Sequence, residues 1–143
     1  MRTLVDDSSG HRSVPHTADL RIEAWAPTRD GFIRQAVLGA VESFLDTSSA
    51  GPRRTRRRRL AADRDDDLLV AVLDDVIYLL DTEAEAPVDL RLTGADGAVD
   101  VEFAMVDATT LPQLGAVPKA VSLNELRLQQ GADGWRCAVT LDV

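Results

Sequence analysis

Two stretches of the chain, residues 19–25 and residues 136–143, alternate apolar and polar positions with a period of two. This period is typical of strands that bury one face. Asp19 and Asp142 fall on the faces opposite to the apolar residues, one at the start of the first strand and one near the end of the last. The apolar residues are Leu20, Ile22, Ala24, Cys137, Val139, Leu141 and Val143.

Two other segments repeat apolar residues at helical spacing. In the first, Pro27 breaks the strand pattern, Thr28 offers an N-cap, and Gly51 with Pro52 ends the segment. The predicted buried face of this helix is Phe32, Ile33, Ala36, Val37, Ala40, Val41, Phe44 and Leu45.

The second helix is predicted to start at three aspartates, residues 65–67, because carboxylates stabilise the positive end of a helix. Asp74 and Asp75 interrupt its apolar surface, and we interpret both as solvated helix acids. The predicted core residues are Leu69, Val72, Leu73, Val76, Ile77 and Leu80. Both helices are expected to be used fully in the core.

The rest of the chain predicts two hairpins. Strands over residues 88–92 and 99–105 flank a glycine turn at 94–97, and a second turn at 131–134 launches the final strand. Between the hairpins, residues 107–118 form a polar loop containing proline and glycine, where a functional lip could lie.

The strand before the second turn changes parity. Val121 and Leu123 occupy one face, whereas Leu126 and Leu128 occupy the other. Keeping both pairs in the core requires an extra residue, so we predict a β-bulge near residues 124–125.

These elements predict one α+β domain with two helices packed on one face of a largely antiparallel β-sheet. The length of 143 residues suits a single domain. Residues 1–13 lack the apolar core of a secretory signal, and we interpret them as a disordered lead-in to a domain over residues 14–143. No apolar run approaches the roughly 20 residues of a membrane span, so we expect a soluble, cytoplasmic protein without membrane contact.

Charge is unevenly distributed along the chain. A formal net charge of −8 argues against broad, sequence-independent adhesion to nucleic acids or membranes, since such binding depends on basic residues. Residues 53–59 nevertheless include six arginines. This segment is either a solvated edge strand, whose charges discourage pairing with other chains, or a contact for RNA phosphate or an acidic protein surface.

The single cysteine, Cys137, excludes an internal disulfide and indicates a reducing compartment. Its position on an apolar face predicts a buried, unreactive thiol. With only two histidines and one cysteine, the composition also argues against a closed zinc site.

The two aspartates suggest a metal site. If their strands are antiparallel neighbours, Asp19 and Asp142 lie about 5 Å apart at Cβ. Like charges this close need a cation, a proton or a basic neighbour. Val143 adds its own carboxylate and carbonyl, and such hard oxygen donors suit Ca²⁺ or Mg²⁺. The alternative is two solvated surface aspartates beside a frayed terminus.

The motif His16-Thr17-Ala18-Asp19 before an alternating strand, the two-helix layout, Lys119-Ala120-Val121 before a hairpin, and the final Leu141-Asp142-Val143 together resemble the archease family. The resemblance covers roughly residues 14–143. It implies an accessory protein of the RtcB-type RNA ligase, which joins tRNA halves and other broken RNAs. Such a protein promotes the GTP-dependent guanylylation and multiple turnover of the ligase without catalysing ligation, and its own RNA contact is indirect or weak.

The resemblance also assigns residues. Asp19, Asp142 and Val143 are the expected metal ligands, with Ca²⁺ as the first expectation and Mg²⁺ or Mn²⁺ as alternatives. His16, Thr17 and Lys119 are expected to surround the metal or to face the partner, and His16 to orient Asp19 by a hydrogen bond.

Some positions depart from the family pattern. Asn124 stands where many archeases have histidine, and Leu123 where they have tyrosine. Arg21 replaces a common glycine, Ser122 a usual threonine, and residues 74–75 a usual amide-acid pair. These departures bear on partner contacts more than on the metal site.

Two other functions stay open. A chaperone-like protein-binding module would need a large exposed apolar patch. A small metal-dependent hydrolase of RNA ends could be drawn from His16, Asp19 and a hydroxyl of Ser13 or Thr17, but the sequence has no glycine-flanked nucleophile elbow.

Overall fold

The computed structural model describes residues 8–15, 19–94 and 97–143. His16 and Thr17, two of the predicted site residues, lie outside these ranges. The elements in chain order are β1 (Gly10–Pro15), β2 (Asp19–Ala26), α1 (Arg29–Glu42), β3 (Arg54–Ala62), α2 (Asp65–Glu83), β4 (Glu85–Thr93), β5 (Gly97–Asp107), the 3₁₀ helix η1 (Ala108–Thr110), β6 (Ala120–Gly131) and β7 (Gly134–Asp142).

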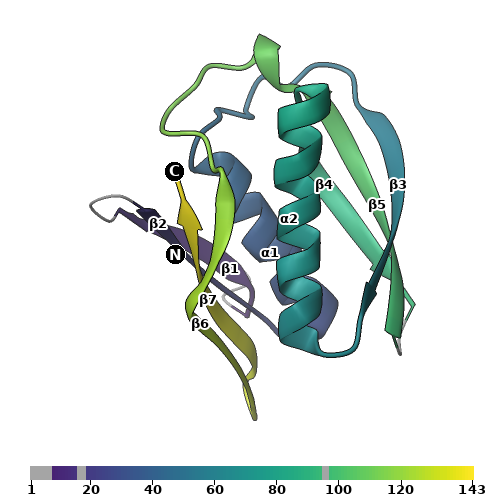
Figure 1. Cartoon of the computed structure of the whole chain (residues 1–143), viewed down its shortest axis with the longest axis vertical. Helices are drawn as coiled ribbons and strands as arrows, with labels where there is room; N and C mark the ends of the chain where they lie inside the picture. The colour runs from purple at the N-terminus through teal and green to yellow at the C-terminus, as the bar shows by residue number, and fades with distance from the viewer. Residues whose placement is uncertain (1–7, 16–18, 95–96) are drawn as a thin grey trace, which may run out of the picture.

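The strands divide into two antiparallel sheets. One has the order β1-β2-β7-β6 and the other the order β3-β5-β4. The two helices lie between the sheets (Figure 1), where α1 contacts β1, β2, β7 and β4, and α2 contacts β3, β4 and β6. The predicted α+β class with two helices on antiparallel strands is confirmed. The partition into two sheets was not predicted, because alternation marks the buried face of a strand and leaves its neighbours undetermined.

Helix α1 begins and packs as its sequence predicts. Thr28 is the N-cap, and its hydroxyl accepts a hydrogen bond of 3.0 Å from the Gly31 N–H. A Cβ at Gly31 would lie 2.8 Å from both Ala26 Cβ and Thr28 Oγ1, so the capped turn has no room for a side chain. All eight predicted core residues of this segment are buried.

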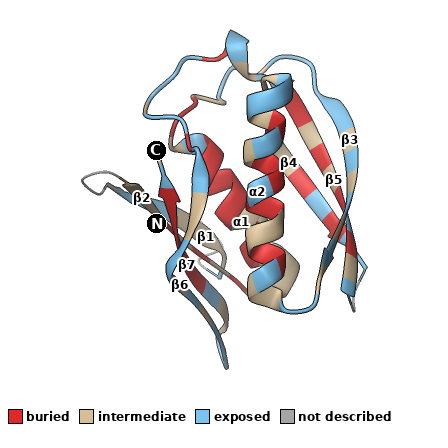
Figure 2. Ribbon diagram, in the orientation of Figure 1, coloured by how far each residue is buried: buried red, intermediate tan, exposed pale blue. Residues whose placement is uncertain are grey.

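Helix α2 buries most of the predicted face. Leu69, Val72, Leu73, Val76 and Leu79 are buried, whereas Ile77 and Leu80 are only half-buried. Asp75 is also buried, at 8% exposure, so the prediction that it is a solvated acid is wrong. Figure 2 shows exposed and buried residues alternating along α2. Tyr78 is 55% exposed, and α2 is therefore not used fully in the core.

The predicted lead-in is partly structured. Residues 10–13 belong to β1, which pairs antiparallel with β2 from Gly10 opposite Trp25 to Pro15 opposite Leu20. His11 ties this strand to α1, with Nδ1 2.7 Å from Gln35 Oε1 and Nε2 3.1 Å from Glu42 Oε1. The disorder prediction for these residues is wrong because an edge strand can be held by backbone pairing without an apolar pattern of its own.

The predicted bulge in β6 is confirmed. The register with β7 shifts between Ser122 and Arg127, and Glu125 adopts a left-handed φ of 65°. Leu123 does not reach the core as predicted; it is 70% exposed because the irregular segment lifts it off the sheet.

Buried side chains from both sheets and both helices form one apolar cluster. Its largest fully buried members include Phe32, Phe103 and Ile22. Among the residues that the structure describes, no helix is long and apolar enough to cross a membrane.

Candidate functional site

Asp19 and Asp142 face each other across adjacent strands. Strands β2 and β7 pair antiparallel, and these two residues are direct cross-strand partners at the end of the ladder. Partners in such a pair project from the same face with Cβ atoms about 5 Å apart. The apolar residues beside them, Ile22 and Leu141, are fully buried on the opposite face. The structure thus brings the two carboxylates together as the alternation predicts. We call this end of the sheet the acidic rim, defined by Asp19 and Asp142.

The third strand at the acidic rim is β6. Its first residue, Ala120, is opposite Asp142, and the Lys119 N–H donates a hydrogen bond of 2.7 Å to the Asp142 carbonyl. Val143 follows Asp142 directly and is half-buried. The Lys119 side chain is exposed and therefore accessible to a partner.

The donor chemistry of the acidic rim fits a hard cation. Oδ1 of Asp19 is shielded from solvent, whereas Asp142 is exposed at the end of its strand. The donors are carboxylate and carbonyl oxygens, the type that Ca²⁺, Mg²⁺ and Mn²⁺ prefer. Within the described part of the chain, no group of three or more His, Cys, Asp and Glu side chains is arranged around one point. The two aspartates are therefore the only side-chain carboxylates that the described residues bring to this point, and His16 and Thr17 lie outside the description.

A basic side chain flanks the acidic rim on the same face. Arg21, two residues along β2 from Asp19, is opposite Thr140, and its Nη1 lies 3.5 Å from Thr140 Oγ1. Glu125, whose left-handed backbone forms part of the β6 bulge, lies 3.7 Å from Arg21. Arg21 thus engages Thr140 and Glu125, and the bulge explains how Glu125 reaches it.

Residues 11–143 match the sequence profile of the Archease protein family (MTH1598/TM1083). The chain belongs to the archease family. A Mycobacterium tuberculosis protein named probable protein archease is 79% identical over 136 residues, which cover 95% of this chain and 76% of that protein. Protein archease of Methanosarcina barkeri is 27% identical over 137 residues, which cover 91% of this chain and 93% of that protein.

Two solved structures share the fold. The solution structure of Methanobacterium thermoautotrophicum protein 1598 aligns with a TM-score of 0.74 at 18% identity, covering 94% of this chain and 99% of that one. The crystal structure of a Thermotoga maritima protein, named an archease and possible chaperone, aligns with a TM-score of 0.67 at 17% identity, covering 91% and 94%. The archease match begins at residue 11, within β1, so the domain extends further toward the N-terminus than residue 14.

Two residues that are expected to depart from the archease pattern lie in the irregular part of β6. Leu123 and Asn124 are both exposed, and the Asn124 N–H donates to Ser122 Oγ at 3.3 Å. Neither side chain is needed for the core. Their substitution therefore leaves the pairing of Asp19 with Asp142 intact.

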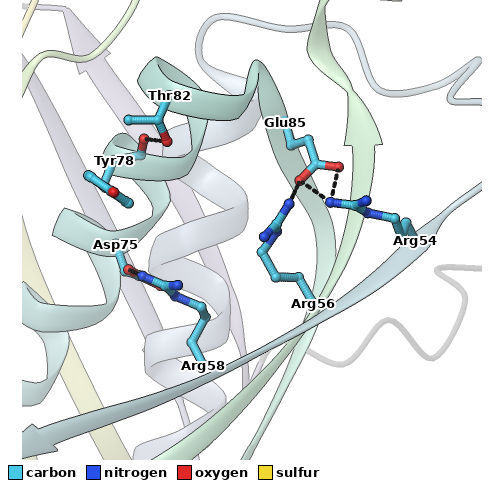
Figure 3. A network of polar contacts seen from close by, with 7 residues as sticks. All are labelled: Arg54, Arg56, Arg58, Asp75, Tyr78, Thr82 and Glu85. Atoms are coloured by element: carbon cyan, nitrogen blue, oxygen red, sulfur yellow. Dashed lines mark hydrogen bonds and ion pairs between the residues drawn. The ribbon is translucent and has the colours of Figure 1, made fainter.

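The arginine segment forms β3, an edge strand as predicted, but not all of its arginine side chains are solvated. Arg54 and Arg56 both bond Glu85, with the shortest contact 2.7 Å from Arg56 (Figure 3). On the opposite face, Arg57 and Arg59 are 80% and 70% exposed. Arg54, Arg56, Arg57 and Arg59 all have carboxylate partners, but the side chains of Arg57 and Arg59 remain largely exposed, whereas that of Arg56 is 22% exposed.

Asp75 is a buried acid with a structural partner, which the sequence pattern did not predict. Arg58 Nε and Nη2 donate to its two carboxylate oxygens at 2.9 and 2.8 Å, and the arginine also lies 5.9 Å from the ring centre of Tyr78. The hydrogen bond to Asp75 raises the pKa of Arg58 above its usual value. The missed signal was spacing, because Asp75 shares the helix face of Leu68, Val72 and Leu79.

Cys137 matches its prediction. The thiol is buried, at 3% exposure, and burial raises its pKa to about 12. A thiol with that pKa carries almost no thiolate at neutral pH and is a poor nucleophile.

A groove of about 790 Å³ adjoins the acidic rim. The second half of α2 forms one side, and the loop after β5 forms the other; Figure 1 shows this loop passing the C-terminal end of α2 on its way to β6. Backbone hydrogen bonds anchor the loop, from Leu114 N–H to Phe44 O at 2.8 Å and from Asp46 N–H to Pro112 O at 2.9 Å. Lys119 and Ala120 line the end of the groove that leads to Asp142.

Proposed function

We propose that the protein is an accessory factor of an RtcB-type RNA ligase, which promotes the GTP-dependent guanylylation and multiple turnover of that enzyme. The observation that carries this proposal is the direct cross-strand pairing of Asp19 with Asp142 in a chain of the archease family. The role is one of activation in tRNA splicing or RNA repair, and ligation stays with the partner. A cytoplasmic location follows from that partner and agrees with a single buried thiol.

Asp19 and Asp142 would hold a divalent cation together with main-chain oxygen from Val143, and Ca²⁺ is the first candidate ahead of Mg²⁺ and Mn²⁺. A bound cation would neutralise the paired carboxylates and present positive charge to an anionic group of the partner. Lys119 would face the partner beside it, with its main chain anchored to Asp142. His16 is proposed to orient Asp19. Thr17 is proposed to surround the metal or to face the partner at the acidic rim.

A guanylylation assay tests the proposal. The purified RtcB-type ligase of the same organism is incubated with labelled GTP, with and without the protein, and the covalent ligase–guanylate product is measured over several turnovers of RNA joining. Wild-type protein should raise both the yield and the number of turnovers. Asp19→Asn and Asp142→Asn should lose this effect, whereas Asp133→Asn, in the exposed turn before β7, should keep it. Absence of any stimulation by the wild type would refute the proposal.

A chaperone-like protein-binding role is the second candidate, and one observation favours it. Tyr78, Leu114 and Val117 are large apolar residues exposed at 55%, 64% and 39% near the groove. The Thermotoga maritima relative of the same fold is named a possible chaperone. Suppression of aggregation of an unrelated heat-denatured protein, at equimolar ratio and without ligase, would support this role; an effect restricted to the ligase would exclude it.

A further inference from the structure

The groove beside the acidic rim has an apolar wall, and acidic residues lie at its opening. Ile77, Tyr78 and Val117 contribute to the wall, and Asp74 and Asp81 lie on the helix side of the opening. Tyr78 and Val117 remain 55% and 39% exposed. An exposed aromatic residue in a concave, partly apolar site is the kind of residue that anchors protein partners.

The charges around the groove select the chemistry of its occupant. Asp74 and Asp81 are acidic, and Lys119, at the end next to the acidic rim, is the one basic residue among the described residues that line the groove. Phosphate groups of RNA would be repelled along the helix side, whereas a lysine or arginine would be attracted. Burial raises the pKa of Asp74, so its carboxylate is already partly desolvated and would gain from a cationic partner.

We propose that this groove is the docking site for a protein segment that presents an apolar side chain next to a lysine or arginine. The inference rests on the proposed function, because it places that segment on the RNA ligase. The apolar side chain fills the space between Tyr78 and Val117, and the basic side chain pairs with Asp74 and Asp81.

One end of the groove lies next to the acidic rim. Lys119 and Ala120 line its far end, and both contact Asp142 through backbone pairing. A segment seated in the groove therefore lies beside the acidic rim. Docking along α2 would bring the acidic rim to the ligase and orient it there. The groove would then set the affinity for the ligase, and the acidic rim would set the activation of the ligase.

The test uses two groove variants, each with a matched control. Asp81→Arg reverses a charge at the opening, and Glu83→Arg makes the same change in charge at an exposed position of the same helix that does not line the groove. Val117→Ser removes a wall side chain, and Val14→Ser is the same substitution on β1 at 37% exposure against 39%. All four proteins and the wild type are titrated against the purified ligase, and both binding and stimulated guanylylation are measured.

The groove variants should each raise the half-maximal concentration for stimulation about tenfold or more while leaving the plateau unchanged. The effect of Asp81→Arg should shrink at high salt. Both controls should match the wild type, and melting temperatures with divalent-ion titrations verify that fold and rim are intact in every variant.

The outcomes separate the two proposals. No stimulation by the wild type refutes the proposed function. Stimulation by the wild type with unchanged half-maximal concentrations for Asp81→Arg and Val117→Ser refutes the groove as the docking site and leaves the proposed function standing. A photoreactive p-benzoylphenylalanine in place of Tyr78 gives an independent result. Crosslinks to a ligase peptide that carries a basic residue support the inference, whereas crosslinks to RNA or to a second copy of this chain overturn it.

Discussion

The acidic rim and the arginine strand β3 both concentrate charge of one sign, yet the fold treats them differently. On β3, Arg56 and Arg58 reach carboxylates of Glu85 and Asp75 from other elements. At the rim, the cross-strand neighbour of Asp19 is another carboxylate, Asp142. A dense run of charge in the sequence is thus a poor guide to a site. The informative feature is like charge that tertiary pairing places together.

The largest expected effect comes from removing a rim carboxylate. Asp19→Asn and Asp142→Asn should each lower Ca²⁺ affinity more than about a hundredfold, because even groups that only orient metal ligands contribute tenfold to a hundredfold. Titration calorimetry with Ca²⁺, Mg²⁺ and Mn²⁺ measures the change, and circular dichroism verifies the fold. Unchanged titrations in both variants would remove the metal site and make the rim a pair of surface acids.

The next largest effect concerns the paired arginines of β3. Asp75→Ala should lower the free energy of unfolding by about 2–3 kcal/mol, since it leaves Arg58 half-buried without its carboxylate partner. Asp100→Ala breaks the exposed pair with Arg59 and should cost under about 1 kcal/mol. Urea denaturation measures both. Equal losses would show that burial does not distinguish the two pairs.

A smaller difference in the free energy of unfolding is expected between arginine substitutions on the two faces of β3. Replacing Arg57 and Arg59 by glutamine should change the free energy of unfolding by no more than about 0.5 kcal/mol, because both side chains face solvent. The same change at Arg56 and Arg58 should cost about 1–2 kcal/mol more, through lost bonds to Glu85 and Asp75. Any effect of the outer pair on ligase stimulation should be a salt-sensitive association step. A greater loss from the outer pair would reverse the assignment of the faces.

The smallest effect concerns Asp74 at the groove. Burial raises its pKa above 3.8, so folding favours its neutral form, and that stabilisation is lost as the pH rises through the folded-state pKa. Asp74→Asn should therefore raise the melting temperature slightly at pH 7 and leave it almost unchanged at pH 3. Differential scanning calorimetry at the two pH values measures this. A lower melting temperature at pH 7 would mean that the ionised carboxylate stabilises the fold.

Local patterns predicted a large part of this molecule correctly. The Thr28 cap, the core face of α1, the strand at Asp19 and the bulge at Glu125 each depend on residues a few positions apart. The parity of each strand end also predicted the face on which Asp19 and Asp142 lie, and their meeting was predicted on the condition that the two strands are neighbours, which the pairing of β2 with β7 fulfils. These features depend on short-range geometry that the residue order expresses directly.

Other features depended on contacts that no local pattern encodes. The polar residues 10–13 became β1 because β2 offered a backbone edge, and Asp75 is neutralised because Arg58 reaches it from β3. The groove exists because the loop after β5 is bonded to the end of α1 and passes along α2.

By itself, the sequence determined which side of β2, of β7 and of α1 is apolar, where that helix starts, and that Asp19 and Asp142 lie opposite the apolar faces at the ends of their strands. Only the tertiary structure decided that the strands form two sheets, which arginines are neutralised, and where a groove opens beside the rim. The physical reason is that hydrophobic periodicity specifies burial, whereas pairing and charge compensation are decided by which distant segments the packed core brings together.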